Sequence, residues 1–99
     1  WLSIQKTAHS QSIVSPPTGN TKIESSNSEY NIRGGVLSES SNNLFHDFLE
    51  FNLTSEETAN FWGSASTQNI IGSVSGGNTS FIDCRLQVLG SDANLFLLN

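Results

Sequence analysis

The chain has 99 residues, of which 13% are charged, and a formal net charge of −5 with only four cationic side chains, Lys6, Lys22, Arg33 and Arg85. Because phosphate groups are bound by clustered lysine and arginine, these scattered cations argue against nucleic acid, anionic lipid and heparin as partners. No apolar run approaches the roughly 18 residues of a membrane-spanning helix, and the single cysteine, Cys84, excludes an internal disulfide framework.

The polar residues favour strands over helices. The sequence contains 17 serines, 11 asparagines and 8 glycines. Serine and asparagine compete with the helical backbone for hydrogen bonds, and glycine costs about 1 kcal/mol in a helix relative to alanine. The composition therefore predicts one all-β domain in which short strands are joined by many turns.

The first 30 residues alternate short apolar pairs with polar turns. Val14 precedes residues 15–20, Ser-Pro-Pro-Thr-Gly-Asn, which form a turn signal between two predicted strands. Tyr30 and Ile32 then have the spacing of one strand face. The Gly-Gly pair at 34–35 predicts a tight corner, because glycine accepts positive φ angles and close backbone approach.

Residues 43–54, NLFHDFLEFNLT, combine two patterns. Leu44, Phe45, Phe48 and Leu49 have helix-like spacing, but for one turn only. Leu49, Phe51 and Leu53 then alternate with polar residues, which is the period of a half-buried strand. We predict a bulged loop that feeds a strand, followed by a short capped turn around Ser55 that is too brief to persist as a helix.

The remaining apolar runs are short and end at Gly, Ser, Asn or Asp. Predicted strand centres at Ile32, Phe51, Ile71 and Val88 recur roughly 17–20 residues apart. This spacing fits a parallel β-helix, in which each coil uses two or three short strands. An antiparallel β-sandwich is the competing fold, because turn signals every roughly 8–12 residues suit it equally well.

His46, Asp47 and Glu50 are the nearest approach to a chemical site. They lack the HxxxH, HxH or CxxC spacing of metal ligands, and the strand pattern turns His46 and Glu50 apart. We expect His46 to satisfy a backbone group in the loop and Glu50 to face solvent. Cys84 has no histidine near it in the sequence and is interpreted as a buried structural thiol.

Several asparagines stand at predicted strand ends. Their amides can cap open backbone groups at corners and stack from one coil to the next, and binding of a partner strand or a sugar is the functional alternative. The residues are Asn31, Asn43, Asn52, Asn69, Asn94 and Asn99.

Four stretches together resemble a known family: IRGGV (32–36), NLFHDFLEFNL (43–53), NIIGSVSGGNTSFID (69–83) and LGSDANLFLLN (89–99). Their order and spacing are similar to those of the N-terminal two-partner secretion domain, also called the haemagglutination activity domain, of filamentous-haemagglutinin-like proteins. The cyanobacterial members look closest. The resemblance covers about two thirds of the chain, from Ile32 to Asn99.

The resemblance implies a single domain over residues 1–99, a right-handed parallel β-helix with N-terminal cap strands in 1–31 and rungs in 32–99. It also implies a non-enzymatic secretion module, without cofactor or metal, at the start of a large exported adhesin or haemagglutinin. Such a module is recognised by an outer-membrane transporter with POTRA domains and passes through the periplasm to the cell surface. Asn99 stands where the family's Asn-Pro-Asn-Gly motif begins, so a truncated domain is expected. Cys84 replaces a glycine common in the family.

The resemblance also names candidate recognition residues. They are Asn43, Leu44, Phe45, His46, Phe48, Glu50, Phe51, Asn52, Asn94, Leu95, Phe96 and Asn99. A different hypothesis is a carbohydrate-dependent adhesion domain that binds host or environmental glycans, for which Trp62 beside Asn60 is the candidate. A third is a polysaccharide-cleaving enzyme, which would need clustered carboxylates that the scattered Asp47, Asp83 and Asp92 do not supply.

Overall fold

The computed structural model describes residues 13–54, 56–76, 79–81 and 85–99. These residues form strands and turns without a helix, which confirms the predicted all-β class. The strands are β1 (Ile13–Val14), β2 (Thr21–Ser26), β3 (Glu29–Gly34), β4 (Val36–Leu37), β5 (Asn43–Phe48), β6 (Glu50–Leu53), β7 (Thr58–Trp62), β8 (Asn69–Val74), β9 (Thr79–Phe81), β10 (Arg85–Leu89) and β11 (Asn94–Leu98).

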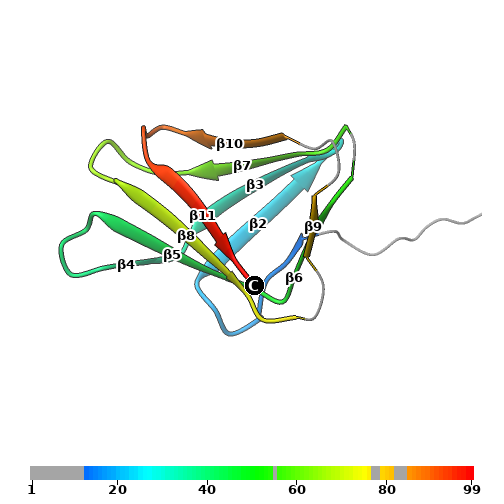
Figure 1. Ribbon diagram of the computed structural model, residues 1–99, viewed down its shortest axis with the longest axis horizontal. Helices are drawn as coiled ribbons and strands as arrows, with labels where there is room; N and C mark the ends of the chain where they lie inside the picture. The colour runs from blue at the N-terminus through cyan, green and yellow to red at the C-terminus, as the bar shows by residue number, and fades with distance from the viewer. Residues whose placement is uncertain (1–12, 55, 77–78, 82–84) are drawn as a thin grey trace, which may run out of the picture.

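The described strands lie in three sheets, which Figure 1 shows wrapped around a common interior. Sheet A has the order β1-β6-β9, sheet B the order β10-β7-β3-β2, and sheet C the order β11-β8-β5-β4. In each sheet an edge strand, β1, β2 or β4, pairs antiparallel with its neighbour. The other pairs are parallel, so all three sheets are mixed.

The parallel pairs join segments that lie 25 to 29 residues apart in the sequence. In sheet B, Glu29 pairs with Thr58, and Thr58 pairs with Arg85. In sheet C, Asn69 pairs with Asn43 on one side and with Asn94 on the other. The chain therefore visits sheets B, C and A through β3, β5 and β6, and then visits them again through β7, β8 and β9.

Two expectations are wrong. Among the described strands, five of the eight pairings are parallel and the sheets number three, so the antiparallel sandwich does not fit. The expected 17–20-residue repeat is wrong because the strand centres from which it was measured belong to different sheets. Ile32 and Val88 belong to sheet B, whereas Phe51 belongs to sheet A and Ile71 to sheet C.

The core lies where the inner faces of the sheets meet. Phe48, Phe51 and Phe61 are fully buried. The Phe48 and Phe51 ring centroids are 5.0 Å apart with edge-to-face packing, and those of Phe51 and Phe61 are 6.0 Å apart and stacked. The other buried apolar residues are Ile13, Tyr30, Ile32, Leu44, Leu53, Ala59, Ile70 and Val74.

The first turn and the glycine corner agree with the sequence. Residues 15–20 join β1 to β2, and Tyr30 and Ile32 are buried on the same face of β3. Gly34 and Gly35 have φ angles of 78° and 90°, as expected for a tight corner. Ser55 lies outside the described residues.

Residues 43–48 do not form the expected bulged loop. They form strand β5, and Leu49 makes the corner to β6. Leu49 is consequently 38% exposed, although the alternating pattern placed it inside with Phe51 and Leu53, both of which are buried. The prediction failed because Phe45 is an apolar residue on the outer face of β5, so adjacent apolar side chains point in opposite directions.

Candidate recognition surface

Along strand β5, the side chains of the motif at residues 43–53 alternate between the core and the surface. Leu44, His46 and Phe48 point inward and are at most 6% exposed, whereas Phe45 and Asp47 point outward and are exposed. This alternation follows from the period of two in a strand. Only one half of the motif can therefore be contacted by a partner once the chain has folded.

An apolar row crosses the outer face of sheet C. Val36 pairs with Phe45, Phe45 with Ile71, and Ile71 with Phe96. Val36, Phe45 and Phe96 are 43–49% exposed. The sequence predicted Phe45 and Phe96 but missed Val36 and Ile71. The 26-residue offset between β5 and β8 relates Ile71 to Phe45, whereas Val36 lies on β4, which pairs with β5 antiparallel.

An asparagine ladder runs beside this row. The Asn69 Nδ2 donates to Asn43 Oδ1 at 2.9 Å, and the Asn94 Nδ2 donates to Asn69 Oδ1 at 3.4 Å. These asparagines begin β5, β8 and β11, so the expected stacking of amides at strand ends is confirmed for them. Asn31 and Asn52 instead lie within β3 and β6.

His46 lies in the core and does not bond a loop backbone group as expected. Its Nδ1 is 3.0 Å from Thr21 Oγ1, which also accepts the Asp47 backbone N–H at 3.1 Å. Its Nε2 has no hydrogen-bond partner among the described residues. Burial lowers the pKa of His46 from 6.5 to about 4, and the Asp47 carboxylate partly opposes that change. The imidazole is therefore neutral at neutral pH.

The other candidate recognition residues are distributed over two sheets. Phe51 is buried in β6, and Glu50 of the same strand is exposed, as predicted. Leu95 is packed against the core. Asn94 and Asn99 are exposed and Asn52 is half-buried. The fold thus brings Asn43, Phe45, Asn94 and Phe96 together on sheet C and hides Leu44, His46, Phe48 and Phe51.

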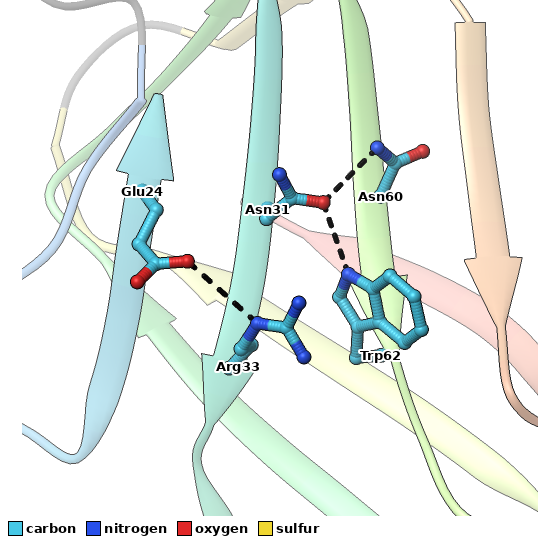
Figure 2. Close-up of polar contacts among 5 residues, drawn as sticks. All are labelled: Glu24, Asn31, Arg33, Asn60 and Trp62. Carbon is cyan, nitrogen blue, oxygen red and sulfur yellow. Dashed lines mark hydrogen bonds and ion pairs between the residues drawn. The ribbon is translucent and has the colours of Figure 1, made fainter. Parts of the chain in front are cut away.

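The candidate glycan residues lie on the outer face of sheet B (Figure 2). The Asn31 Oδ1 accepts hydrogen bonds from Asn60 Nδ2 at 3.2 Å and from Trp62 Nε1 at 3.0 Å. The Asn60 Oδ1 accepts a third from Gln87 Nε2 at 2.8 Å. Asn60 is only 4% exposed, so within this cluster Asn31, Trp62 and Gln87 are the groups that solvent can reach.

The described part of the chain gives little support for a metal site or a membrane-spanning helix. There, no three His, Cys, Asp or Glu residues are arranged to hold a metal ion. His46 points inward from β5 and Glu50 points outward from β6, so they do not converge on one site, as the strand pattern predicted. No helix long and apolar enough to cross a membrane is found among the described residues. Asp83 and Cys84 lie outside them.

Comparison with known proteins agrees with this arrangement of motifs. A family model of the TPS secretion domain, the domain of two-partner secretion, matches residues 10–99. The chain belongs to the TPS secretion domain family. No curated protein and no solved structure matches it.

Family membership sets the general role of this TPS secretion domain. Such domains are secretion modules of two-partner systems, found in exported proteins that an outer-membrane transporter carries out of the cell. The match covers all four motifs on which the resemblance was based.

Proposed function

We propose that this chain is the non-enzymatic secretion module at the start of a large exported adhesin or haemagglutinin. A POTRA-containing outer-membrane transporter recognises it in the periplasm and passes it to the cell surface. The observation that carries the proposal is the family match over residues 10–99.

We infer further that the fold is a right-handed parallel β-helix with an N-terminal cap. The parallel pairs at offsets of 25–29 residues support the helix. The antiparallel edge strands β1 and β2, which lie within residues 1–31, support a cap at one end of sheets A and B. The handedness follows from the resemblance and from the strong preference of parallel crossovers for the right hand.

Recognition takes place before folding. Four of the candidate recognition residues, Leu44, His46, Phe48 and Phe51, are at most 6% exposed in the folded chain. In the unfolded chain the whole stretch 43–53 is available as an extended, apolar segment. Such a segment can add as a strand to a sheet edge of the transporter, where main-chain hydrogen bonds give affinity and alternate side chains give specificity.

Folding then opposes rebinding. Once β5 and β6 are paired with β8 and β9, their backbone groups and inward side chains are no longer available to the transporter. A partner that binds only the unfolded chain competes with folding. Folding outside the cell therefore favours release on that side and movement of the chain outward.

Titration calorimetry tests the proposal. The chain, kept unfolded in mild urea or folded in buffer, is titrated with the POTRA region of the transporter encoded beside it. We expect micromolar binding by the unfolded chain and binding weaker by about tenfold or more when the chain is folded. In urea, Phe48→Ala and Phe45→Ala should both weaken binding, because both side chains are accessible there.

The two variants separate two modes of recognition. If the folded chain binds as tightly as the unfolded chain and Phe45→Ala alone matters, the transporter reads the outer face of sheet C, and recognition before folding is wrong. If neither state binds, even with the chain extended through the family's Asn-Pro-Asn-Gly motif, the secretion function itself is wrong.

A further inference from the structure

The outer face of sheet C is apolar, whereas the solvent-facing side of a sheet is usually polar. Val36, Phe45, Ile71 and Phe96 form one row across all four strands, which Figure 1 shows side by side. Leu98 lies two residues beyond Phe96 on the same side of β11 and is 56% exposed. Single apolar side chains on a surface need no explanation, but a contiguous row marks a contact with another molecule.

Charge is nearly absent from this face. Asp47 is the one charged side chain at an outward position of the described strands of sheet C. The lysines and arginines of the described strands lie instead in sheet B, where Arg33 forms an ion pair with Glu24 (Figure 2). A face without cations does not attract nucleic acid or an anionic membrane. Its apolar row suits another apolar and nearly uncharged protein surface.

The face has the size of a small protein interface. Its four strands, at about 4.8 Å between strands and about 3.3 Å per residue, cover roughly 19 Å by 16 Å. Two sheets packed face to face lie about 10 Å apart, so their outward side chains meet. With the relief of the side chains, two copies together would bury roughly 1,000 Å², the lower limit for a specific protein interface. The area is therefore sufficient for a weak, reversible dimer.

We propose that the outer face of sheet C binds the same face of a second copy, so that the folded chain forms a weak two-fold dimer. The two-fold axis runs along the apolar row, midway between the two sheets, and places each row against its copy. The strands of the two copies then run in opposite directions. The contact requires only the folded chain and is separate from recognition by a transporter.

This arrangement also provides a partner for the carboxylate of the face. Asn43 and Asp47 lie on either side of Phe45 on the outer face of β5. Because the axis reverses the strand, Asn43 of one copy lies opposite Asp47 of the other. The asparagine ladder uses the Asn43 Oδ1 as an acceptor, so its amide nitrogen can donate to that carboxylate. In the same way, Asn69 lies opposite Ser73 of the other copy.

Sedimentation velocity of the folded chain, from about 1 μM to about 1 mM, measures the association. We expect a reversible monomer–dimer equilibrium with a dissociation constant on the order of 100 μM. Phe45→Thr should weaken it at least tenfold, because it removes an aromatic contact from the row and keeps a residue with high strand propensity. Since β5 is paired with both β4 and β8, this change does not alter an open edge of the sheet.

Leu86→Thr is the matched control on another sheet. Leu86 is 37% exposed on β10, the edge strand of sheet B, so the variant loses exposed apolar surface away from the proposed contact. It should change the dissociation constant by no more than about twofold. Circular dichroism melts verify that both variants fold.

Crosslinking tests the position of the axis. In a Cys84→Ser background, Ile71→Cys places one thiol in the row, where the thiols of the two copies face each other across the axis. A short bifunctional maleimide should join these chains into dimers. Lys22→Cys places the thiol on sheet B and should not be joined.

Four results would overturn the proposal. The first is a monomer at every concentration. The second is a dimer weakened by Leu86→Thr and not by Phe45→Thr, which would mean pairing through the open edge strands β10 and β11. The third is a dimer that is lost when the chain is extended through the family's Asn-Pro-Asn-Gly motif, which would mean that another segment of the same chain covers the face. The fourth is equal crosslinking of Ile71→Cys and Lys22→Cys, which would mean non-specific association.

Discussion

His46 is a polar side chain placed among phenylalanines. Its ring centroid is 6.0 Å from that of Phe48 and 6.1 Å from that of Phe61, and it is 1% exposed. Thr21 meets one ring nitrogen and leaves the other without a partner among the described residues. A proton added here would place a charge in the core, so this residue links folding to pH.

We predict that acidification below pH 6.5 destabilises the fold. The folded-state pKa of His46 is about 4 against 6.5 for an exposed histidine, so between these values only the unfolded chain binds the proton. The contribution of neutral His46 is complete above pH 6.5, is lost as the pH falls toward 4, and is constant below that. Its full size is about 3 kcal/mol. Urea unfolding at several pH values measures it.

His46→Leu is the matched variant, because it replaces the imidazole by an apolar side chain that suits the buried site and removes the titration. Carboxylates contribute to the pH dependence of both proteins, so the difference between the two slopes isolates His46. Equal slopes between pH 6.5 and 4 would contradict the assignment.

At the scale of elements, side-chain amides tie successive strands together. Sheet C contains the Asn43–Asn69–Asn94 ladder, and sheet B contains a row from Asn31 through Asn60 to Gln87. In both, the amide of the later strand donates its hydrogen bond to the amide oxygen of the earlier strand. Each new strand thus brings a donor to an acceptor that is already in place. The ladders therefore stabilise one register of strand pairing relative to shifted registers.

Removing the middle amide should cost more than removing the last one. Asn69→Ala loses two ladder contacts at a half-buried position, for about 1–2 kcal/mol of unfolding free energy. Asn94→Ala loses one long contact at an exposed position and should stay within about 0.5 kcal/mol. Denaturant unfolding distinguishes them, and equal effects of the two substitutions would contradict the larger contribution assigned to Asn69.

The corner at Gly35 depends on the absence of a side chain. Its φ is 90°, and a Cβ would lie 2.8 Å from the Phe45 carbonyl oxygen and 2.9 Å from His46 Cε1. Gly35→Ala should therefore destabilise the chain by about 1–3 kcal/mol. At Gly19 the nearest atom would be 3.5 Å away, so Gly19→Ala should be nearly neutral. A thermal midpoint for Gly35→Ala as high as that for Gly19→Ala would refute this.

Some elements could be predicted from the sequence because burial alone shapes their pattern. Tyr30 and Ile32 alternate with polar residues, as do Phe51 and Leu53, and the Gly34-Gly35 corner has the residue type that its φ angles require. Strand β5 was missed because Phe45 is apolar yet exposed. Alternation identifies a strand only when its outer face is polar.

At the scale of the whole molecule, the repeat could not be recognised in the sequence, because strands that follow one another along the chain belong to different sheets. Each pass uses strands from different sheets, so neighbouring strand centres in the sequence are not neighbours in space. Offsets also vary from 25 to 29 residues because corners differ in length. A fixed-period search does not find the apolar row of sheet C. That surface required the topology.

Different parts of the molecule are accessible before and after folding. Stretch 43–53 is available before folding and half hidden afterwards, whereas the apolar row of sheet C comes together only on folding. A chain of this kind can be recognised by its transporter in one state and can pair with a second copy in the other.

Export itself is the most direct test. The chain, extended through the Asn-Pro-Asn-Gly motif and supplied with a signal peptide, is produced in a bacterial host together with its transporter or with the same transporter lacking its POTRA domains. The account predicts that the chain reaches the medium with the complete transporter and stays in the periplasm with the truncated one. Equal amounts in the medium for both transporters, or none for either while the transporter exports its usual substrate, would contradict it.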